Sequence, residues 1–517
     1  GFESLLVKTL APVMLKDDPN QSEFLDFYLP FSGKLSASNR WAKLADLVPW
    51  DLVEQCYRES FAGTGMGAPA KSGRIAFGAL LIKERLGVTD EETVEQITEN
   101  PYLQYFLGLK ELKQERLFDA SMMVHFRSRF TSDHHELINS KIIEQACQAK
   151  EQTESKNEDD QDPPAPSGKL LIDATCTPAD IKFPTDLSLL NEAREKSEQM
   201  IDLFHDELKR DHYGIKKPRT YRQNARKQYL AIAKQKSAGK KKIRKAIGQQ
   251  LNYLKRNLGH IDRMLDCDLK LLAVLGSYQY KNLLVIRTLY QQQRQMHQQR
   301  THSVADRIVS ISQPHVRPIV RGKAASKVEF GAKLSISHQK DGYVSIDTLS
   351  WDAYNESTDL PVQVERYKSR FGYYPESVHA DLIYRTRANR KFCKDLGIRL
   401  SGKALGRPKK QTSENAEQLK TQKLRQRQDE IDRIPVEGKF GNSKRKGTLE
   451  RVMAKLANTS ESVIHIAMIV LNLDKRLCLY KINTAWAMII DALLDIPSFM
   501  LQVHADDFLS PTHDKRC

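Results

Sequence analysis

The sequence predicts an α/β protein in which a mixed sheet flanked by helices follows a helical N-terminal region and is interrupted by a basic helical arm. From residue 169 to 401, apart from that arm, the pattern reads strand, hairpin, helix, strand, helix and strand, which is typical of a mixed sheet. Residues 36–148 instead repeat apolar side chains with the 3.6-residue period of helices. With 517 residues, the chain is long enough for about three domains.

The composition indicates a folded protein with an anionic partner. Hydrophobic residues make up 40% of the chain, which excludes wholesale disorder. Lys and Arg number 81 against 65 Asp and Glu, giving a net charge of +16. Such a surplus favours a polyanion as partner, because each neutralised phosphate releases counterions. A scattered basic surface without a partner is the alternative.

The cysteines and the apolar segments predict where the protein resides. The seven cysteines include no C-x-x-C pair, which favours a reducing compartment and no structural zinc. No secretory signal is visible in the first residues of the sequence. The apolar stretch 485–503 contains Asp491 and Asp495, so a buried helix is a better interpretation than a membrane span. We therefore expect a cytoplasmic protein without a membrane partner.

The first predicted domain, residues 1–148, is helical. One helix includes Phe77 and Leu86 and ends at Gly87, and Thr89 marks the start of the next. Short helices of this kind could bind DNA or pair two subunits, although most of their aromatic side chains are expected to be core. Residues 149–168 are acidic and rich in Pro, which is the composition of a solvated linker.

The predicted sheet domain is divided into residues 169–186 and 304–475. Its first element is a short buried strand over 169–175 with Asp173 at its C-terminal end. Asp341-Gly342 between two alternating runs predicts a hairpin. The elements that follow are a helix over 362–371, a strand over 377–381 that ends in Asp381, a helix over 386–396, a strand over 398–401, mostly helix over 434–473, and a helical tail over 476–517.

The inserted arm, residues 187–303, is predicted to be helical and basic. Between residues 206 and 256 the sequence has 17 Lys or Arg against 3 Asp or Glu, with Lys240, Lys241 and Lys242 at the densest point. A heptad seam follows at Ile247, Leu251, Leu254, Leu258, Ile261 and Leu265, which predicts a helical hairpin or a coiled coil. A charge run is usually a solvated helix face, but one so one-sided favours contact with DNA or RNA.

Three carboxylates are the candidates for chemistry. Asp173 and Asp381 emerge at strand ends, and Glu437 opens the final long helix. Acids that converge in this way can hold two Mg²⁺ ions, which take oxygen ligands and activate phosphodiester chemistry. Any one Asp at a strand end is more often a turn former or a helix cap. Asp180, Asp186 and Asp352 are competing acids.

Several motifs together resemble bacterial insertion-sequence transposases of the IS5/IS1182 type, which belong to the DDE group and have an RNase H-like fold. The segment from Phe31-Ser32-Gly33-Lys34 to Ala146 resembles their helical N-terminal domain. Residues 317–323, 328–333 and 349–352 resemble their second-strand region. Arg433, Glu437 and Lys444 reproduce the R-(3)-E-(6)-K spacing around the third acid of related enzymes.

The resemblance implies a site and its partners. Asp173, Asp381 and Glu437 would be the catalytic metal ligands for two Mg²⁺ or Mn²⁺ ions, and Arg433 and Lys444 would grip phosphate near them. Further DNA contacts would come from Arg321 and Lys323 and from Lys240, Lys241 and Lys242 of the arm. The partners would be double-stranded DNA, as terminal inverted repeats and target, and a second subunit in a homodimer, for which the heptad seam gives support. The protein would be associated with the bacterial nucleoid. The sequence has no G-x-x-x-x-G-K-[ST] loop, so no nucleotide cofactor is expected.

The sequence also departs from the family pattern. Glu430 stands where related signatures often have Tyr, the glycine common after the second acid is missing, and 208 residues separate Asp173 from Asp381. An insertion between strands need not disturb a sheet, and all three acids are present. Two alternatives to an active transposase remain: a DNA-binding protein of transposase descent that has lost catalysis, and a helical scaffold or RNA-binding protein that uses only the arm.

Overall fold

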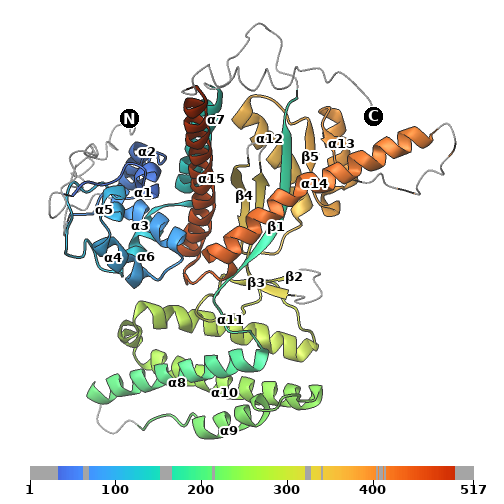
Figure 1. Ribbon diagram of the computed structural model, residues 1–517. Helices are drawn as coiled ribbons and strands as arrows, with labels where there is room; N and C mark the ends of the chain where they lie inside the picture. The colour runs from blue at the N-terminus through green and yellow to red at the C-terminus, as the bar shows by residue number, and fades with distance from the viewer. Residues whose placement is uncertain are drawn as a thin grey trace, which may run out of the picture. The chain divides into compact units, whose positions relative to one another are not determined.

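The computed structural model describes residues 33–61, 69–151, 166–211, 216–320, 328–338, 342–402, 406, 412 and 415–494. The chain divides into two compact units (Figure 1). The first comprises Gly1–Asp160, Asp341–Tyr343 and Met468–Cys517, and the second comprises Gln161–Lys340 and Val344–Ala467. The sheet, the arm and every described candidate for the active site belong to the second unit. The finer domain boundaries expected from the sequence stay predictions.

The first unit is helical, as predicted. Its helices are α1 (Arg40–Ala45), α2 (Trp50–Glu59), α3 (Gly73–Leu86), α4 (Asp90–Glu99), α5 (Pro101–Phe106), α6 (Met122–Arg129), α7 (Ser132–Glu151) and the later part of α15 (Ala457–Leu494). Gly87 ends α3 with φ at +68°, and the Thr89 side chain accepts a hydrogen bond from Glu92 N at the start of α4. Both helix boundaries were expected because Gly adopts the left-handed region and Thr caps orphan N–H groups.

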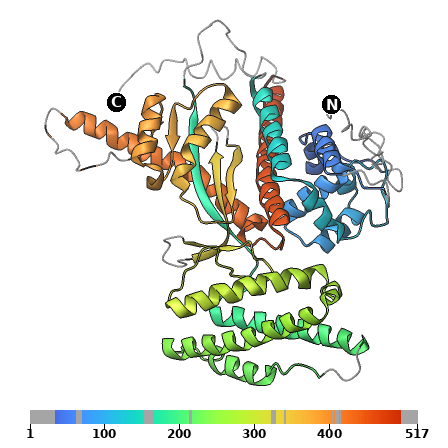
Figure 2. The same ribbon diagram turned by 180° about the vertical axis from the view of Figure 1, so that it is seen from behind.

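The aromatic side chains of this unit form its core. Phe77, Phe106 and Phe126 are fully buried. Helices α7 and α15 lie side by side in both views (Figures 1 and 2), and Asn472 Nδ2 donates a hydrogen bond of 2.7 Å to Asn139 Oδ1 between them. Burial of this kind agrees with the interpretation of the aromatic residues as core.

The second unit contains the predicted mixed sheet. Its strands are β1 (Lys169–Pro178), β2 (Arg317–Val320), β3 (Val328–His338), β4 (Val344–Ser350), β5 (Ser377–His379) and β6 (Arg399–Leu400). Their order is β2-β3-β1-β5-β6, with β4 also paired to β3. Strand β3 pairs antiparallel with β1, β2 and β4, whereas β5 is parallel to β1 and β6. The predicted fold class and the β3–β4 hairpin are confirmed.

Strand β1 is longer than predicted. It runs to Pro178 because its antiparallel register with β3 continues through Thr177 to the pair Pro178–Gly331. Asp173 therefore lies in the middle of the strand, and the prediction that it ends the strand was wrong. The close crossing requires Gly331, since a Cβ there would overlap the carbonyl oxygen of Thr177.

Helices cover both faces of β1. Leu170 and Ile172 point to one face and pack with Leu360, Val364 and Tyr367, which belong to α12 (Leu360–Phe371). Cys393 of α13 (Arg387–Asp395) completes that layer. The other face is crossed by α14 (Ala416–Lys446), as Figure 1 shows. Because successive side chains of a strand alternate between faces, Asp173 lies on the α14 side.

The arm is helical, as predicted. It contains α8 (Asp186–Asp211), α9 (Arg222–Ala233), α10 (Lys240–Cys267), the short 3₁₀ helix η3 (Leu269–Val274) and α11 (Ser277–Gln299). Five of the six seam residues of α10 are buried and Ile247 is partly buried, and they pack with side chains of α8 and α11, such as Phe204 and Ile286. The seam is thus used inside the arm and gives no support to a coiled-coil dimer.

No helix among the described residues is both long enough and apolar enough to span a membrane.

Candidate active site

The register of the two parallel strands places Asp173 beside Asp381. Leu171 of β1 is paired with His379 of β5. Asp173 and Asp381 lie two residues after these partners, so they occupy equivalent positions on the same side of the sheet. Asp381 lies two residues after the end of β5, and its side chain is about half exposed, at 52%. Two carboxylates that are far apart in the sequence are therefore neighbours, with one of them open to solvent.

The surroundings of Asp173 disfavour its negative charge. Burial, together with the charges of Asp381 and Glu356, raises the pKa of this carboxyl to about 6. The Ala174 N–H donates a hydrogen bond of 2.8 Å to Asp173 Oδ1, and Arg433 acts in the same, stabilising direction. Arg433 itself forms an ion pair with Asp381. The pair of acids thus concentrates negative charge that a cation would offset.

Helix α14 is fixed to β1 at two places. Lys169 Nζ lies 2.5 Å from Asp432 Oδ2, and Lys444 Nζ donates to Thr175 Oγ1 at 3.1 Å and to the Cys176 carbonyl at 3.0 Å. The helix rises about 18 Å between its two anchors, and the strand rises about 20 Å between the matching residues. The middle of this helical segment therefore runs alongside the middle of the strand.

Glu437 lies in that middle segment. It is one turn after Arg433 and two turns before Lys444, so the three side chains share one side of the helix. The Glu437 side chain is exposed. The prediction that Glu437 opens a helix was wrong, because α14 begins at Ala416 and contains Pro435 in its interior. A Pro is favoured in the first turn of a helix and disfavoured in its interior, so the sequence alone does not show that α14 continues through Pro435.

A second group of acids lies beside the site. His379 Nδ1 is 3.7 Å from Asp429 Oδ1 and 4.0 Å from Asp432 Oδ2, a spacing that a metal ion could bridge. Asp429, however, already accepts two hydrogen bonds of 2.9 Å from Arg399, and Asp432 is paired with Lys169. Because two cations already balance the two acids, we interpret this cluster as an ionic network that holds α14 against β5 and β6.

Sequence reasoning missed Glu356. This residue begins a short 3₁₀ helix, η4 (Glu356–Thr358), after β4, and its carboxylate is paired with Lys333 at 3.1 Å. Its charge raises the pKa of Asp173, so it belongs to the same electrostatic environment. The only signal in the sequence was the helix-capping pattern that Asn355 begins, which says nothing about a site.

The competing acids are engaged elsewhere. Asp180 is paired with Arg451, Asp186 with Arg307 at 2.7 Å, and Asp352 lies 3.6 Å from Arg317.

The remaining predicted residues are basic. Lys240, Lys241 and Lys242 are exposed in the first turn of α10. Arg321 and Lys323 lie outside the described residues.

Comparison with known proteins relates two segments of the chain to transposases. Residues 378–474 match the family model of a transposase DDE domain, a segment that includes Asp381, Arg433, Glu437 and Lys444. Residues 30–129 match a transposase domain of the DUF772 family. Asp173 lies outside both segments. The resemblance to insertion-sequence transposases is confirmed over these two segments.

One curated relative is also similar. An uncharacterized protein, ORF8 in the nfe locus of Rhizobium meliloti, is 30% identical over 149 residues, which are 28% of this chain and 65% of that protein. The chain thus spans a little under two thirds of the relative's length. No solved structure matches the chain.

Proposed function

We propose that this chain, which carries a transposase DDE domain, is an active DNA transposase that binds element ends and cuts and joins DNA strands at Asp173, Asp381 and Glu437. One observation carries the proposal: the β1–β5 register brings Asp173 and Asp381 together, and α14 is anchored so that Glu437 runs alongside them. This arrangement of a mixed sheet and three acids is what an RNase H-like enzyme of the DDE group requires.

The donor set fits a hard divalent cation. Carboxylate oxygens are the ligands that Mg²⁺ and Mn²⁺ prefer, and the charge of Asp381 raises the pKa of half-buried Asp173, a repulsion that a cation would relieve. Asp173, Asp381 and Glu437 would hold two such ions. When bound, the ions supply an activated hydroxyl and stabilise the leaving oxygen in phosphodiester chemistry.

The two basic residues of α14 have separate roles in this proposal. Arg433 lies at Asp381 and is placed to grip a DNA phosphate beside the acids, because a guanidinium matches phosphate geometry. Lys444 hydrogen-bonds Thr175 and Cys176, which supports a positioning role in addition to the phosphate contact expected from the motif. Arg433 and Lys444 would each contact DNA phosphate even in a variant whose carboxylates cannot support cleavage.

The arm supports DNA as the partner. Lys240, Lys241 and Lys242 occupy the first turn of α10, where the helix dipole disfavours positive charge. Phosphates of bound DNA would offset this repulsion. The proposed partners are therefore terminal inverted repeats and target DNA, bound by a homodimer, since joining two ends calls for two active sites.

The test is cleavage and strand transfer on a duplex that contains an element end, with Mg²⁺ or EDTA. We expect Asp173→Asn, Asp381→Asn and Glu437→Gln each to lower the rate by about a hundredfold or more, while each variant still binds DNA. Asp352→Asn is the matched control, because that acid is exposed and lies away from the site. If the native chain binds DNA but does not cut it even with Mn²⁺, the inactive DNA-binding alternative is correct.

A further inference from the structure

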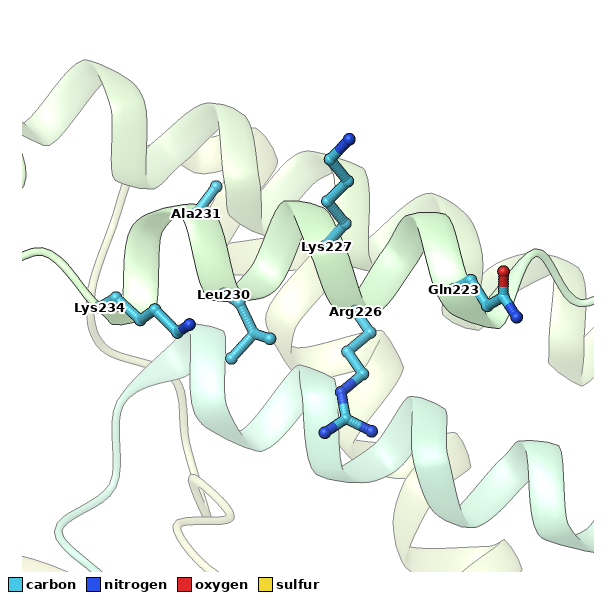
Figure 3. Close-up of a pocket in the computed structure, with 6 residues that line it drawn as sticks. All are labelled: Gln223, Arg226, Lys227, Leu230, Ala231 and Lys234. Carbon is cyan, nitrogen blue, oxygen red and sulfur yellow. The ribbon is translucent and has the colours of Figure 1, made fainter.

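Helix α9 presents an exposed basic face to solvent. Figure 3 looks onto an open hollow of about 500 Å³ that is formed by six side chains of this one helix. They are Gln223, Arg226, Lys227, Leu230, Ala231 and Lys234. Arg226 and Leu230 point to one side of the helix, and Lys227 and Ala231 point to the other (Figure 3). The cations thus surround an apolar centre.

The positive charge of this face is not balanced locally. Residues 212–256 include fifteen Lys or Arg and no Asp or Glu. The nearby acid Asp202 of α8 is already shared by Lys217 at 2.8 Å and Arg222 at 2.7 Å. Within the described residues, the structure records no ion pair for Arg226, Lys227 or Lys234. An anionic partner would therefore meet three available cations.

The opposite face of α9 is held firmly by the arm. Ala225 is fully buried, and its carbonyl accepts a hydrogen bond of 3.0 Å from Gln250 Nε2 of α10. Arg222 forms a bidentate pair with Asp202, with distances of 2.7 and 3.0 Å. The basic face is thus a fixed surface, and little ordering entropy would be lost on binding.

We propose that α9 docks in the major groove of duplex DNA, with Arg226, Lys227 and Lys234 on phosphates at its edges and Leu230 and Ala231 toward the bases. The dimensions of a helix support this mode. An α-helix with its side chains is about 10–12 Å in diameter, and the major groove that would admit it is about 12 Å wide. The uncharged centre of the α9 face suits base edges and thymine methyl groups. A face that binds an acidic protein would instead be expected to carry cations at its centre as well. The inference deepens the proposed function and rests on it.

The test measures binding of the full chain to a fluorescein-labelled DNA duplex by anisotropy in EDTA, which excludes cleavage. The variant is Arg226→Gln/Lys234→Gln. Its matched control, Arg294→Gln/Lys270→Gln, removes the same two charges from exposed positions elsewhere in the arm. From about 50 to 200 mM KCl, loss of two phosphate contacts should lower the slope of log K against log salt by about 1.8 and weaken binding by roughly tenfold or more.

The outcomes separate the two proposals. If the variant loses slope and affinity while the control keeps both, α9 is the docking helix. If the native chain binds and the variant matches the control, the inference is wrong although the proposed function stands. If the native chain binds no duplex at all, both are wrong.

A second variant tests the centre of the face. Ala231 is exposed, so Ala231→Glu should leave the fold intact and place a carboxylate against the DNA. We expect at least a tenfold loss of affinity, and no comparable loss for Ala273→Glu, which is also exposed and lies in η3. Equal binding by the two variants would contradict contact at Ala231.

Discussion

At the scale of single residues, Glu356 extends the acidic site beyond the three expected carboxylates. Its negative charge adds to the field at Asp173, and its pairing with Lys333 fixes its position. We expect Glu356→Gln to raise the Mg²⁺ concentration for half-maximal cleavage several-fold, because the site becomes less negative. Metal titration of the cleavage rate checks this, with Glu365→Gln as control, since Glu365 is exposed and contacts Tyr374. An unchanged metal requirement would show that Glu356 has no influence on the site.

His315 should make stability depend on pH. Burial, with help from Lys281 and Arg317, lowers the pKa of this imidazole from 6.5 to about 4. Between these values the unfolded chain binds a proton that the folded chain does not, so stability falls as pH drops from 6.5 to 4. Allowing for partial exposure, we expect about 1–2 kcal/mol from this group. Urea unfolding across this range should show a shallower pH dependence for His315→Phe, which keeps a ring against Trp351; identical profiles would contradict the prediction.

Two glycines should respond in opposite directions to the same substitution. A Cβ at Gly331 meets the backbone of Thr177, whereas a Cβ at Gly259 of α10 meets nothing within 4 Å. Gly331→Ala should destabilise the protein by about 1–3 kcal/mol through overpacking, and Gly259→Ala should stabilise it by about 1 kcal/mol through helix propensity. Denaturant midpoints measure both, and shifts of the same sign would be the contrary result.

At the scale of elements, a buried ion pair of α8 lies beside the contact of this helix with α10. Arg194 is 1% exposed and binds Glu198 at 2.6 Å. Asn257 of α10 donates to Ser197 of α8 at 3.0 Å beside it.

Removing one partner of that pair leaves a buried charge without compensation. Arg194→Met should lower the free energy of unfolding by about 3–5 kcal/mol, which should be measurable as faster amide hydrogen exchange in α8 and α10. Lys196→Met is the control, because its pair with Glu192 spans 3.7 Å and is partly exposed, and such pairs contribute less than about 1 kcal/mol. Similar exchange rates in both variants would refute this account of the arm.

At the scale of the whole molecule, the heptad seam should affect stability and not assembly. Leu254 is fully buried inside the arm. Leu254→Ala should therefore lower stability by about 2–5 kcal/mol while light scattering gives the same mass as for the native chain. A native dimer that becomes a folded monomer in the variant would show that the seam pairs two subunits.

The sequence predicted what depends on local patterns. The alternation of strands and helices led to the mixed sheet, and apolar runs that end in Asp led to Asp173 and Asp381 as neighbours. It could not predict the length of β1, because Cys176 to Pro178 are held in the strand by β3 from beyond a long insertion. Nor could it predict that α14 continues through Pro435, because the contacts that hold this helix, such as Lys169 with Asp432 and Lys444 with Thr175, are tertiary.

The sequence also could not show which elements pack against a given side of a helix. A heptad pattern shows that one side of α10 is apolar but not that α8 and α11 of the same arm cover it. Glu356 carries no motif, and only the folded chain brings its charge to Asp173. The basic composition indicated nucleic acid, whereas the choice of α9 as the exposed face required knowledge of which acids, such as Asp202, were already engaged.

The two ends of the arm are joined where it leaves the sheet. Gln313 Nε2 donates a hydrogen bond of 2.9 Å to the Asp180 carbonyl, and Ala179, Val309 and Val316 pack together beside it. A segment whose ends already meet can be exchanged for another of different length at little entropic cost. The proposed chemistry of the sheet and the proposed DNA binding of the arm can therefore be inherited separately, and a graft at this junction would join the same sheet to a different arm.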